Sequence, residues 1–307
     1  MGLFGTSGIR GLANEEVTAG LALEVGMALA SLRGPGDYVV ARDVRTTSQM
    51  LALAFSSGIM ACGGDVVYLG LLPTGAVGFL TRELGARAGC VITASHNPPE
   101  YNGLKLFRPD SSPLWPEDQE ELEKAIAGRA FKMASWDRAG SHRISDESRR
   151  YVEAVRGSVE LRRKWKVILD PGCGSASILA PEVFRALGCD VLVVNGQPDG
   201  RFPGRDPDPR PDTIGALMEA VRREGADMGF AYDGDGDRMV VVDEGGRFIP
   251  FDVALAAFAS YMVRTRGGGL VITTVEASCC VDETVEEAGG RVLRTKVGDP
   301  SVSKEVM

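Results

Sequence analysis

The feature that most constrains the fold is an alternation between two kinds of apolar pattern, which repeats along the 307 residues of the chain. Residues 17–32 have the spacing of a helix, and 38–42 form a short apolar run typical of a strand. The next helices are expected at about 47–62 and after Pro73, and the next strands at 65–70 and 88–93. Strands that alternate with helices in this order predict an α/β domain with a largely parallel sheet.

The alternation restarts near residue 140 and again near 247. In the second unit we expect a leading helix, strands at 166–170, 190–194 and 227–232, and helices at 176–187 and 213–225. In the third we expect a hairpin-like pair at 239–243 and 247–249, helices at 252–265 and 279–288, and strands at 270–275 and 291–296. The fold class is therefore α/β, with successive three-layer α/β/α domains and mixed, largely parallel sheets. The expected domains span 1–140, 141–246 and 247–307, and the third, with two clear parallel strands, is expected to be incomplete.

Composition excludes several classes of protein. Lys and Arg number 34 against 42 Asp and Glu, a net charge of −8, which argues against a nucleic-acid partner because phosphate contacts need clustered cations. No apolar run approaches the ~18–20 residues that span a bilayer, so no membrane partner is expected. The N-terminus lacks the pattern of a signal peptide, and the six cysteines form no C-x-x-C pair. These features favour a reducing cytoplasm.

The loop after the strand at 88–93 is the first candidate site, because ligands of open α/β sheets bind beyond the carboxyl ends of strands. Residues 93–105 read TASHNPPEYNGLK, and their Asn-Pro-Pro and Asn-Gly pairs predict a compact loop outside the sheet. Ser95 stands at its apex beside His96, and it could act as a nucleophile if a base or a cation such as Lys105 lies near. A turn held by serine and asparagine hydrogen bonds explains the loop equally well. The G-x-S-x-G elbow of serine hydrolases is absent.

The loop after the strand at 227–232 reads DGDGDR and carries three aspartates. An extended loop would place Asp233, Asp235 and Asp237 on one side, where three hard oxygen ligands suit Mg²⁺ shared with a phosphate. A solvated acidic turn is the alternative. A calcium-binding EF-hand is excluded, because Arg238 stands where that loop needs glycine and the flanks are expected to be strands.

Two glycine-rich segments complete the candidates. Residues 170–177, DPGCGSAS, resemble the turn of methyltransferases that bind S-adenosylmethionine, although a tight strand–helix turn accounts for them too. A dinucleotide site would need a third glycine where Ser177 stands. Near the N-terminus, FGTSGIRG offers free amides, the hydroxyls of Thr6 and Ser7, and the guanidinium of Arg10. Together these groups make a plausible phosphate cradle.

Four motifs in order, FGTSGIRG, TASHNPPEYNGLK, DGDGDR and TKVGDP (295–300), resemble those of the α-D-phosphohexomutases. That family includes phosphomannomutases, phosphoglucomutases and phosphoglucosamine mutases. The resemblance covers essentially the whole chain, and FPGRDPDPRPD (202–212) is similar to a segment of the family's second domain. The resemblance implies a mutase of hexose phosphates, with Mg²⁺ as cofactor and a hexose 1,6-bisphosphate as activator and phosphoryl donor.

The resemblance also implies a role for each matching residue. Ser95 would carry a phosphoryl group, pass it to a sugar monophosphate, and recover the other phosphate after the bisphosphorylated sugar reorients. The Mg²⁺ ligands would be Asp233, Asp235, Asp237 and a phosphoryl oxygen on Ser95. Lys105 and His96 would transfer protons, and Arg10 and Arg238 would stabilise the transferring charge. The residues expected to contact the substrate or its phosphates are Thr6, Ser7, Asn97, Arg238 and Asp299.

The chain also departs from the family pattern. Members have four domains, with a G-E-x-S-G loop for sugar recognition in the third and an R-x-S-G-T-E-P loop for phosphate in the fourth. Neither motif is present, so the chain is expected to stop before the end of the third domain and to lack the fourth. A non-catalytic remnant that binds a sugar phosphate or a metal is therefore an alternative to a mutase. The identity of the hexose is not predicted.

Overall fold

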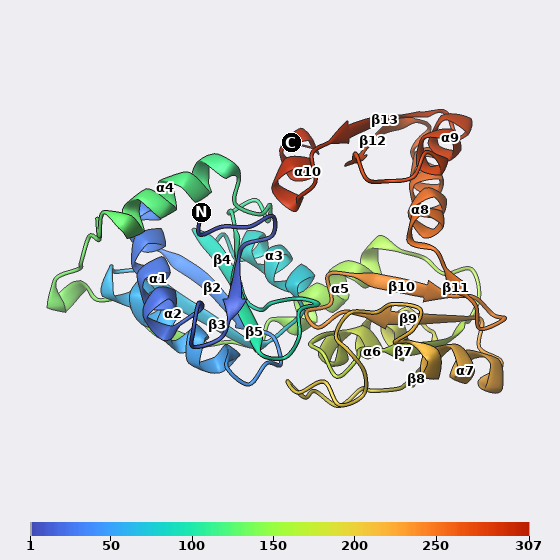
Figure 1. Ribbon diagram of the computed structural model, residues 1–307, viewed down its shortest axis with the longest axis horizontal. Coiled ribbons are helices and arrows are strands. Elements are labelled where there is room, and N and C mark those ends of the chain that lie inside the picture. Colours follow the sequence, from blue (N-terminus) through green and yellow to red (C-terminus); the bar gives the residue numbers. More distant parts are fainter. Residues whose placement is uncertain (1, 307) are drawn as a thin grey trace.

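The computed structural model describes residues 2–306, and its N-terminal unit is built on a six-stranded sheet (Figure 1). The strands, in spatial order, are β1 (Ile9–Leu12), β5 (Tyr101–Phe107), β4 (Ala88–Ile92), β2 (Asp37–Arg42), β3 (Asp65–Leu71) and β6 (His142–Ile144). The last four run parallel, and β1 and β5 pair antiparallel. The sheet is thus mixed, and the predicted α/β class is confirmed.

Helices cover both faces of this sheet. One face carries α1 (Ala19–Arg33), α2 (Ser48–Ala61) and α4 (Pro116–Ala127), and the other carries α3 (Thr74–Glu83) and α5 (Ser148–Ser158). A short 3₁₀ turn lies at Trp136–Arg138. Alternate residues of β2 feed the two cores: Tyr38 and Val40 pack toward α1 and α2, whereas Val39 and Ala41 pack toward α3. The unit therefore has three layers.

Two glycines let α1 and α2 cross in close contact. A Cβ built on Gly58 would lie 2.2 Å from the carbonyl oxygen of Leu23, and one on Gly26 would lie 2.3 Å from that of Phe55. We expect Gly58→Ala to lower the free energy of unfolding by about 1–3 kcal/mol, because the helices must separate. Urea unfolding measures this loss. The control is Gly157→Ala in α5, where a Cβ meets nothing within 4 Å and a gain of roughly 0.5–1 kcal/mol is expected. Equal unfolding midpoints for Gly58→Ala and wild type would contradict the close crossing.

The second unit has a five-stranded sheet. Its strands, in spatial order, are β11 (Phe248–Ile249), β10 (Met239–Val242), β9 (Met228–Tyr232), β7 (Lys166–Asp170) and β8 (Asp190–Val193). The strands β9, β7 and β8 are parallel, and β10 and β11 form an antiparallel edge. Helix α6 (Ala176–Ala186) packs on one face and α7 (Gly215–Glu224) on the other.

The third unit is smaller and reaches back toward the first. It pairs β12 (Gly269–Thr274) with β13 (Gly290–Thr295) in parallel, beside α8 (Phe251–Arg266) and α9 (Cys280–Glu287). Its last helix, α10 (Asp299–Val306), lies in Figure 1 between the strands β12 and β13 and the first unit. Lys304 of α10 forms a 2.6 Å ion pair with Glu117 of α4. The loop before α10 is thereby brought close to the N-terminal sheet.

The structure differs from the sequence-based expectation at several elements. Residues 101–107 belong to β5, although the whole of 93–105 was expected to leave the sheet as a loop; pairing with both β4 and β1 outweighs the turn-forming Asn-Gly pair. The short strand β1 and the helix α4 were not expected, whereas α10 stands where a further helix was expected to begin. Strand β6 belongs to the first sheet although it follows residue 140. The domain boundaries at 140 and 247 stay predictions.

Over the residues that the structure describes, none of the helices combines the length and the apolar character that crossing a membrane requires.

Candidate functional site

Ser95 lies where the first and second units meet. It follows β4 in the turn toward β5, is 1% exposed, and donates a 2.7 Å hydrogen bond from Oγ to Oδ2 of Asp233, which follows β9. Nδ1 of His96 lies 3.3 Å from Oγ of Ser95. The backbone of Ser95 has φ of 54°, a left-handed conformation that is uncommon outside glycine. The turn thus presents the hydroxyl to the aspartate loop at a cost in backbone strain.

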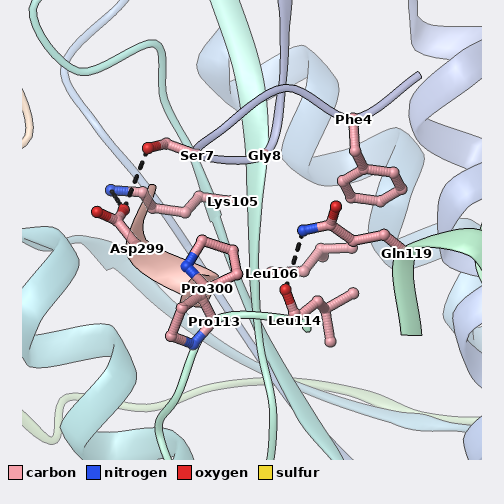
Figure 2. A pocket seen from close by; sticks show the side chains of 10 residues that line it. All are labelled: Phe4, Ser7, Gly8, Lys105, Leu106, Pro113, Leu114, Gln119, Asp299 and Pro300. Carbon is pink, nitrogen blue, oxygen red and sulfur yellow. Dashed lines mark hydrogen bonds and ion pairs between the residues drawn. The ribbon is translucent and has the colours of Figure 1, made fainter. Parts of the chain in front are cut away.

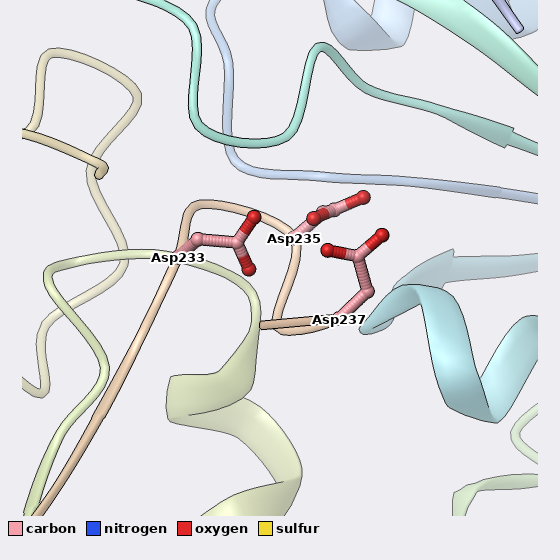
Figure 3. Close-up of side chains that lie close together, drawn as sticks. All are labelled: Asp233, Asp235 and Asp237. Atoms are coloured by element: carbon pink, nitrogen blue, oxygen red, sulfur yellow. The ribbon is translucent and has the colours of Figure 1, made fainter. Parts of the chain in front are cut away.

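The three aspartates of the DGDGDR loop converge, as Figure 3 shows. One carboxylate oxygen from each of Asp233, Asp235 and Asp237 lies within 4.8 Å of the others. The loop is a tight turn and not the extended segment we expected: Gly236 has φ of 72°, and its N–H donates to the Asp233 carbonyl at 3.2 Å. The convergence was predicted correctly, but the turn produces it.

The carboxylates fit a hard divalent cation. Asp235 is fully buried; its Oδ2 accepts a 2.6 Å hydrogen bond from Thr74, and its Oδ1 has no hydrogen-bond partner among the described residues. A buried oxygen without a partner is costly, and a metal ion would satisfy it. A donor set made only of carboxylate oxygens is the kind that Mg²⁺ prefers.

The three carboxylates of the cluster repel one another and differ in how far the protein compensates their charges. Burial raises the pKa of Asp233 well above its usual range, and the charges of Asp235 and Asp237 raise it further. Burial, followed by the charge of Asp237, also raises the pKa of Asp235. Burial acts on Asp237 in the same direction, but the neighbouring ammonium of Lys105 outweighs it and the pKa is lowered. Two of the three carboxylates are therefore poorly compensated by the protein.

Lys105 is the cation that the protein itself brings to this cluster. It extends from β5, is buried, pairs with Asp237, and lies 3.9 Å from Asp299 (Figure 2). Burial alone would lower the pKa of Lys105, but the charges of Asp235 and Asp237 outweigh burial and raise it. The ammonium therefore stays charged at neutral pH.

The N-terminal motif lies against the same region. Because β1 pairs with β5, the guanidinium of Arg10 lies beside the serine loop, with Nη1 3.5 Å from Oδ1 of Asn97. Ser7 donates a 3.1 Å hydrogen bond to Asp299 at the start of α10, a contact visible in Figure 2. The motif therefore bridges the first and third units.

A cleft of about 760 Å³ opens between these units. Its lining includes four of the residues expected to bind substrate or phosphate: Thr6, Ser7, Arg238 and Asp299.

Burial, aided by the charges of Arg238 and Arg10, lowers the pKa of His96, so its imidazole is neutral at pH 7. The predicted residues thus form two adjoining groups: one around Ser95 and the aspartates, the other around the cleft. Their roles remain predictions.

Sequence reasoning missed two residues of this region. Thr74, at the start of α3, holds Asp235 through both its hydroxyl and its N–H. Arg45 is 1% exposed and pairs with Asp43 at 3.0 Å, just beyond the end of β2. An arginine and an aspartate directly after a buried strand are unusual enough to have marked this loop.

The DPGCGS turn has a structural role. Its Gly172 faces a buried Arg205, and a Cβ at that glycine would lie 2.6 Å from the guanidinium carbon. Arg205 in turn pairs with Asp170 at 3.0 Å and donates to the carbonyl of Tyr232. The turn is therefore packed against a buried ion pair of the protein itself, which accounts for its glycine without a cofactor.

Three family models together match most of the chain. Profiles described as phosphoglucomutase/phosphomannomutase, alpha/beta/alpha domains I, II and III match residues 1–133, 149–246 and 250–307. A protein named probable phosphoglucosamine mutase from Methanothermobacter thermautotrophicus is 50% identical over 305 residues, which are 99% of this chain and 67% of the relative.

Solved structures agree with these matches. A phosphoglucomutase/phosphomannomutase family protein from Burkholderia thailandensis superposes with a TM-score of 0.90 at 33% identity, over 99% of this chain and 68% of its own. N-acetylphosphoglucosamine mutase of Aspergillus fumigatus, solved in complex with GlcNAc-6P and magnesium, has a TM-score of 0.59 at 16% identity, over 99% of this chain and 64% of its own. At that identity the fungal structure supports the fold alone.

Proposed function

The chain belongs to the phosphoglucomutase/phosphomannomutase family, whose named relatives are mutases and hence isomerases, and from this premise we propose that it transfers phosphoryl groups on a hexose phosphate through Ser95. The observation that carries the proposal is the 2.7 Å hydrogen bond between Ser95 and Asp233. It joins a buried hydroxyl of one unit to a carboxylate cluster of another. Phosphoryl transfer needs such positioning and charge neutralisation more than covalent chemistry from the protein.

The metal would be held by Asp233, Asp235 and Asp237, together with a phosphoryl oxygen once Ser95 is modified. A bound Mg²⁺ supplies neutralisation of the charge on the phosphoryl oxygens. A donor set of carboxylate oxygens supports this choice of ion. The unpartnered oxygen of Asp235 supports it from within this chain.

The remaining residues orient the reactants and move protons. In the step that loads the enzyme, the bond between phosphorus and a sugar oxygen of the 1,6-bisphosphate breaks, and one between phosphorus and Oγ of Ser95 forms. The ammonium of Lys105 can give its proton to the departing sugar oxygen and recover it in the reverse step. The neutral imidazole of His96, 3.3 Å from Oγ, can accept the serine proton. Arg10 and Arg238 face the transferring group as cations.

Hexose phosphates are the proposed substrates, and glucosamine phosphate is the first to test. The choice is supported by the Methanothermobacter relative, whose name specifies phosphoglucosamine. The cleft beside Ser7 and Asp299 supplies the polar lining that such a ligand needs. A cytoplasmic location belongs to the same proposal.

Incubation of the wild-type chain with a hexose 1,6-bisphosphate and Mg²⁺ tests the proposal. We expect intact mass to increase by one phosphoryl group, and peptide mapping to place it within residues 93–105. Phosphorus NMR of glucosamine 6-phosphate with the loaded chain then follows formation of the 1-phosphate. A chain that takes up no phosphoryl group with any of the glucose, mannose or glucosamine bisphosphates would refute the assignment of Ser95.

A further inference from the structure

Four strained residues gather around the contact between the serine loop and the aspartate loop. Seven non-glycine residues have positive φ among residues 2–306, and four of them are Ser95, Cys173, Asn195 and Phe202. The last three belong to one network of backbone hydrogen bonds. The N–H of Cys173 donates to the Asn195 carbonyl at 2.8 Å, that of Asp199 to the Cys173 carbonyl at 3.0 Å, and that of Phe202 to the Asp199 carbonyl at 3.0 Å. Strain that persists in a folded chain is maintained by its surroundings and concentrates at functional sites.

Arg45 holds the serine loop through its backbone. Its guanidinium donates to the carbonyl oxygens of Ser95, Asn97, Pro98 and Tyr101 at 2.5–2.9 Å. A single buried side chain thus fixes both ends and the apex of the turn that carries Ser95. Because the guanidinium is a planar, rigid fork, lysine cannot reproduce these four contacts.

Phe202 connects this arginine to the aspartate loop. The side chain, 5% exposed, belongs to the connection between β8 and α7, and the Arg45 guanidinium lies 5.2 Å from its ring centroid. The ring also lies close to Gly234, where a Cβ would lie 3.3 Å from Cζ of Phe202 and 2.6 Å from the Ser95 carbonyl oxygen. Gly200 packs against residues 44–46 in the same way, since its Cβ would lie 2.4 Å from the Val44 carbonyl.

From this arrangement we propose that Arg45 and Phe202 are positioning residues, which set the alignment of Ser95 with the aspartate loop for phosphoryl transfer. Neither side chain reaches the reacting atoms. Arg45 orients the turn that carries Ser95. Phe202 packs between this arginine and Gly234, and so sets the distance between the turn and the aspartate loop. The inference rests on the proposed function, because the alignment matters only if Ser95 is the acceptor.

The decisive variant is Phe202→Leu, which keeps an apolar side chain but loses the flat ring. We expect phosphorylation of Ser95 by a hexose 1,6-bisphosphate to slow about tenfold at saturation, since a 1 Å misplacement can cost up to about 100-fold. The concentration that gives half the maximal rate should not change, because no substrate contact is lost. The affinity for Mn²⁺, followed by its paramagnetic resonance signal, should also be unchanged, because one loop supplies all three carboxylates.

The matched control is Phe184→Leu, which removes a ring from the second unit's core, where Phe184 packs 5.1 Å from Phe230. This variant should lose stability and keep the wild-type rate. Arg45→Lys is expected to lower the rate further than Phe202→Leu. If Arg45→Lys does not fold, the comparison of Phe202→Leu with Phe184→Leu still tests the positioning role of Phe202.

Hydrogen exchange separates this inference from the proposed function. In Phe202→Leu, amides of residues 94–103 should exchange faster than in wild type, whereas Phe184→Leu should leave them unchanged. Wild-type labelling with an equal rate in Phe202→Leu would overturn the positioning role and leave the proposed function intact. If the wild type takes up no phosphoryl group, the proposed function fails; unchanged exchange at 94–103 would then overturn the structural coupling too.

Discussion

Ser95→Ala should abolish uptake of a phosphoryl group from a hexose 1,6-bisphosphate while leaving the chain folded. The variant removes the oxygen on which the phosphoryl group is proposed to reside, and no other hydroxyl among the described residues makes a hydrogen bond to Asp233. Labelling should fall below detection by mass spectrometry, because the loss is of the acceptor itself and not of its activation.

The fold should withstand this substitution at a modest cost. Oδ2 of Asp233 loses its hydrogen-bond donor, which costs about 1–3 kcal/mol in a buried setting, and alanine must adopt the left-handed conformation of Ser95. A thermal melt should therefore show a small decrease in Tm and a single transition.

Ser56→Ala is the matched control for this prediction. Ser56 in α2 is equally buried, and its Oγ has no hydrogen-bond partner among the described residues, so its removal should leave labelling and stability near wild type. If Ser95→Ala were labelled at the wild-type rate, or if the label mapped outside residues 93–105, the nucleophile would be another residue.

The sequence predicted the elements that have their own periodicity. The strands β2, β3, β4, β7, β8 and β9 and the helices α1, α2, α6 and α7 carry runs of apolar residues whose spacing indicates the element directly. Strand β5 has no such signal, since its YNGLKLF begins with a turn-forming pair and contains a lysine. Its conformation depends on two neighbouring strands, and pairing of that kind is not encoded locally.

The candidate site likewise combines residues with a local sequence signal and residues that depend on distant contacts. The cluster of Asp233, Asp235 and Asp237 was predictable because all three lie within five residues, so any compact loop brings them together. The roles of Arg45 and Phe202 were not predictable, because these residues are 50 and 107 positions away from Ser95 in the sequence. The arginine and aspartate after β2 could have marked their own loop, but the contact of Arg45 with the Ser95 carbonyl oxygen is visible only in the folded chain.

Asp235→Asn should stabilise the chain in the absence of divalent cations and eliminate its stabilisation by Mg²⁺. Asparagine keeps an oxygen that can accept the hydrogen bond from Thr74 and removes one of three mutually repelling charges, so the Tm measured in EDTA should rise. Wild type, at a Mg²⁺ concentration 100-fold above the dissociation constant, should gain about 2.7 kcal/mol. If the substitution weakens affinity about 100-fold, the gain at that concentration falls to about 0.4 kcal/mol.

Thermal melts in EDTA and in Mg²⁺ measure both effects on the same sample. The control is Asp190→Asn, which removes the same charge from an exposed position in β8 of the second unit. It should leave the Mg²⁺-dependent increase in Tm intact, because its carboxylate is not part of the cluster. An Asp235→Asn chain that melts lower than wild type in EDTA would show that repulsion does not dominate the cluster. One that keeps the full response to Mg²⁺ would show that the ion binds elsewhere, since the buried, unpartnered oxygen of Asp235 is the feature by which the structure identifies this site.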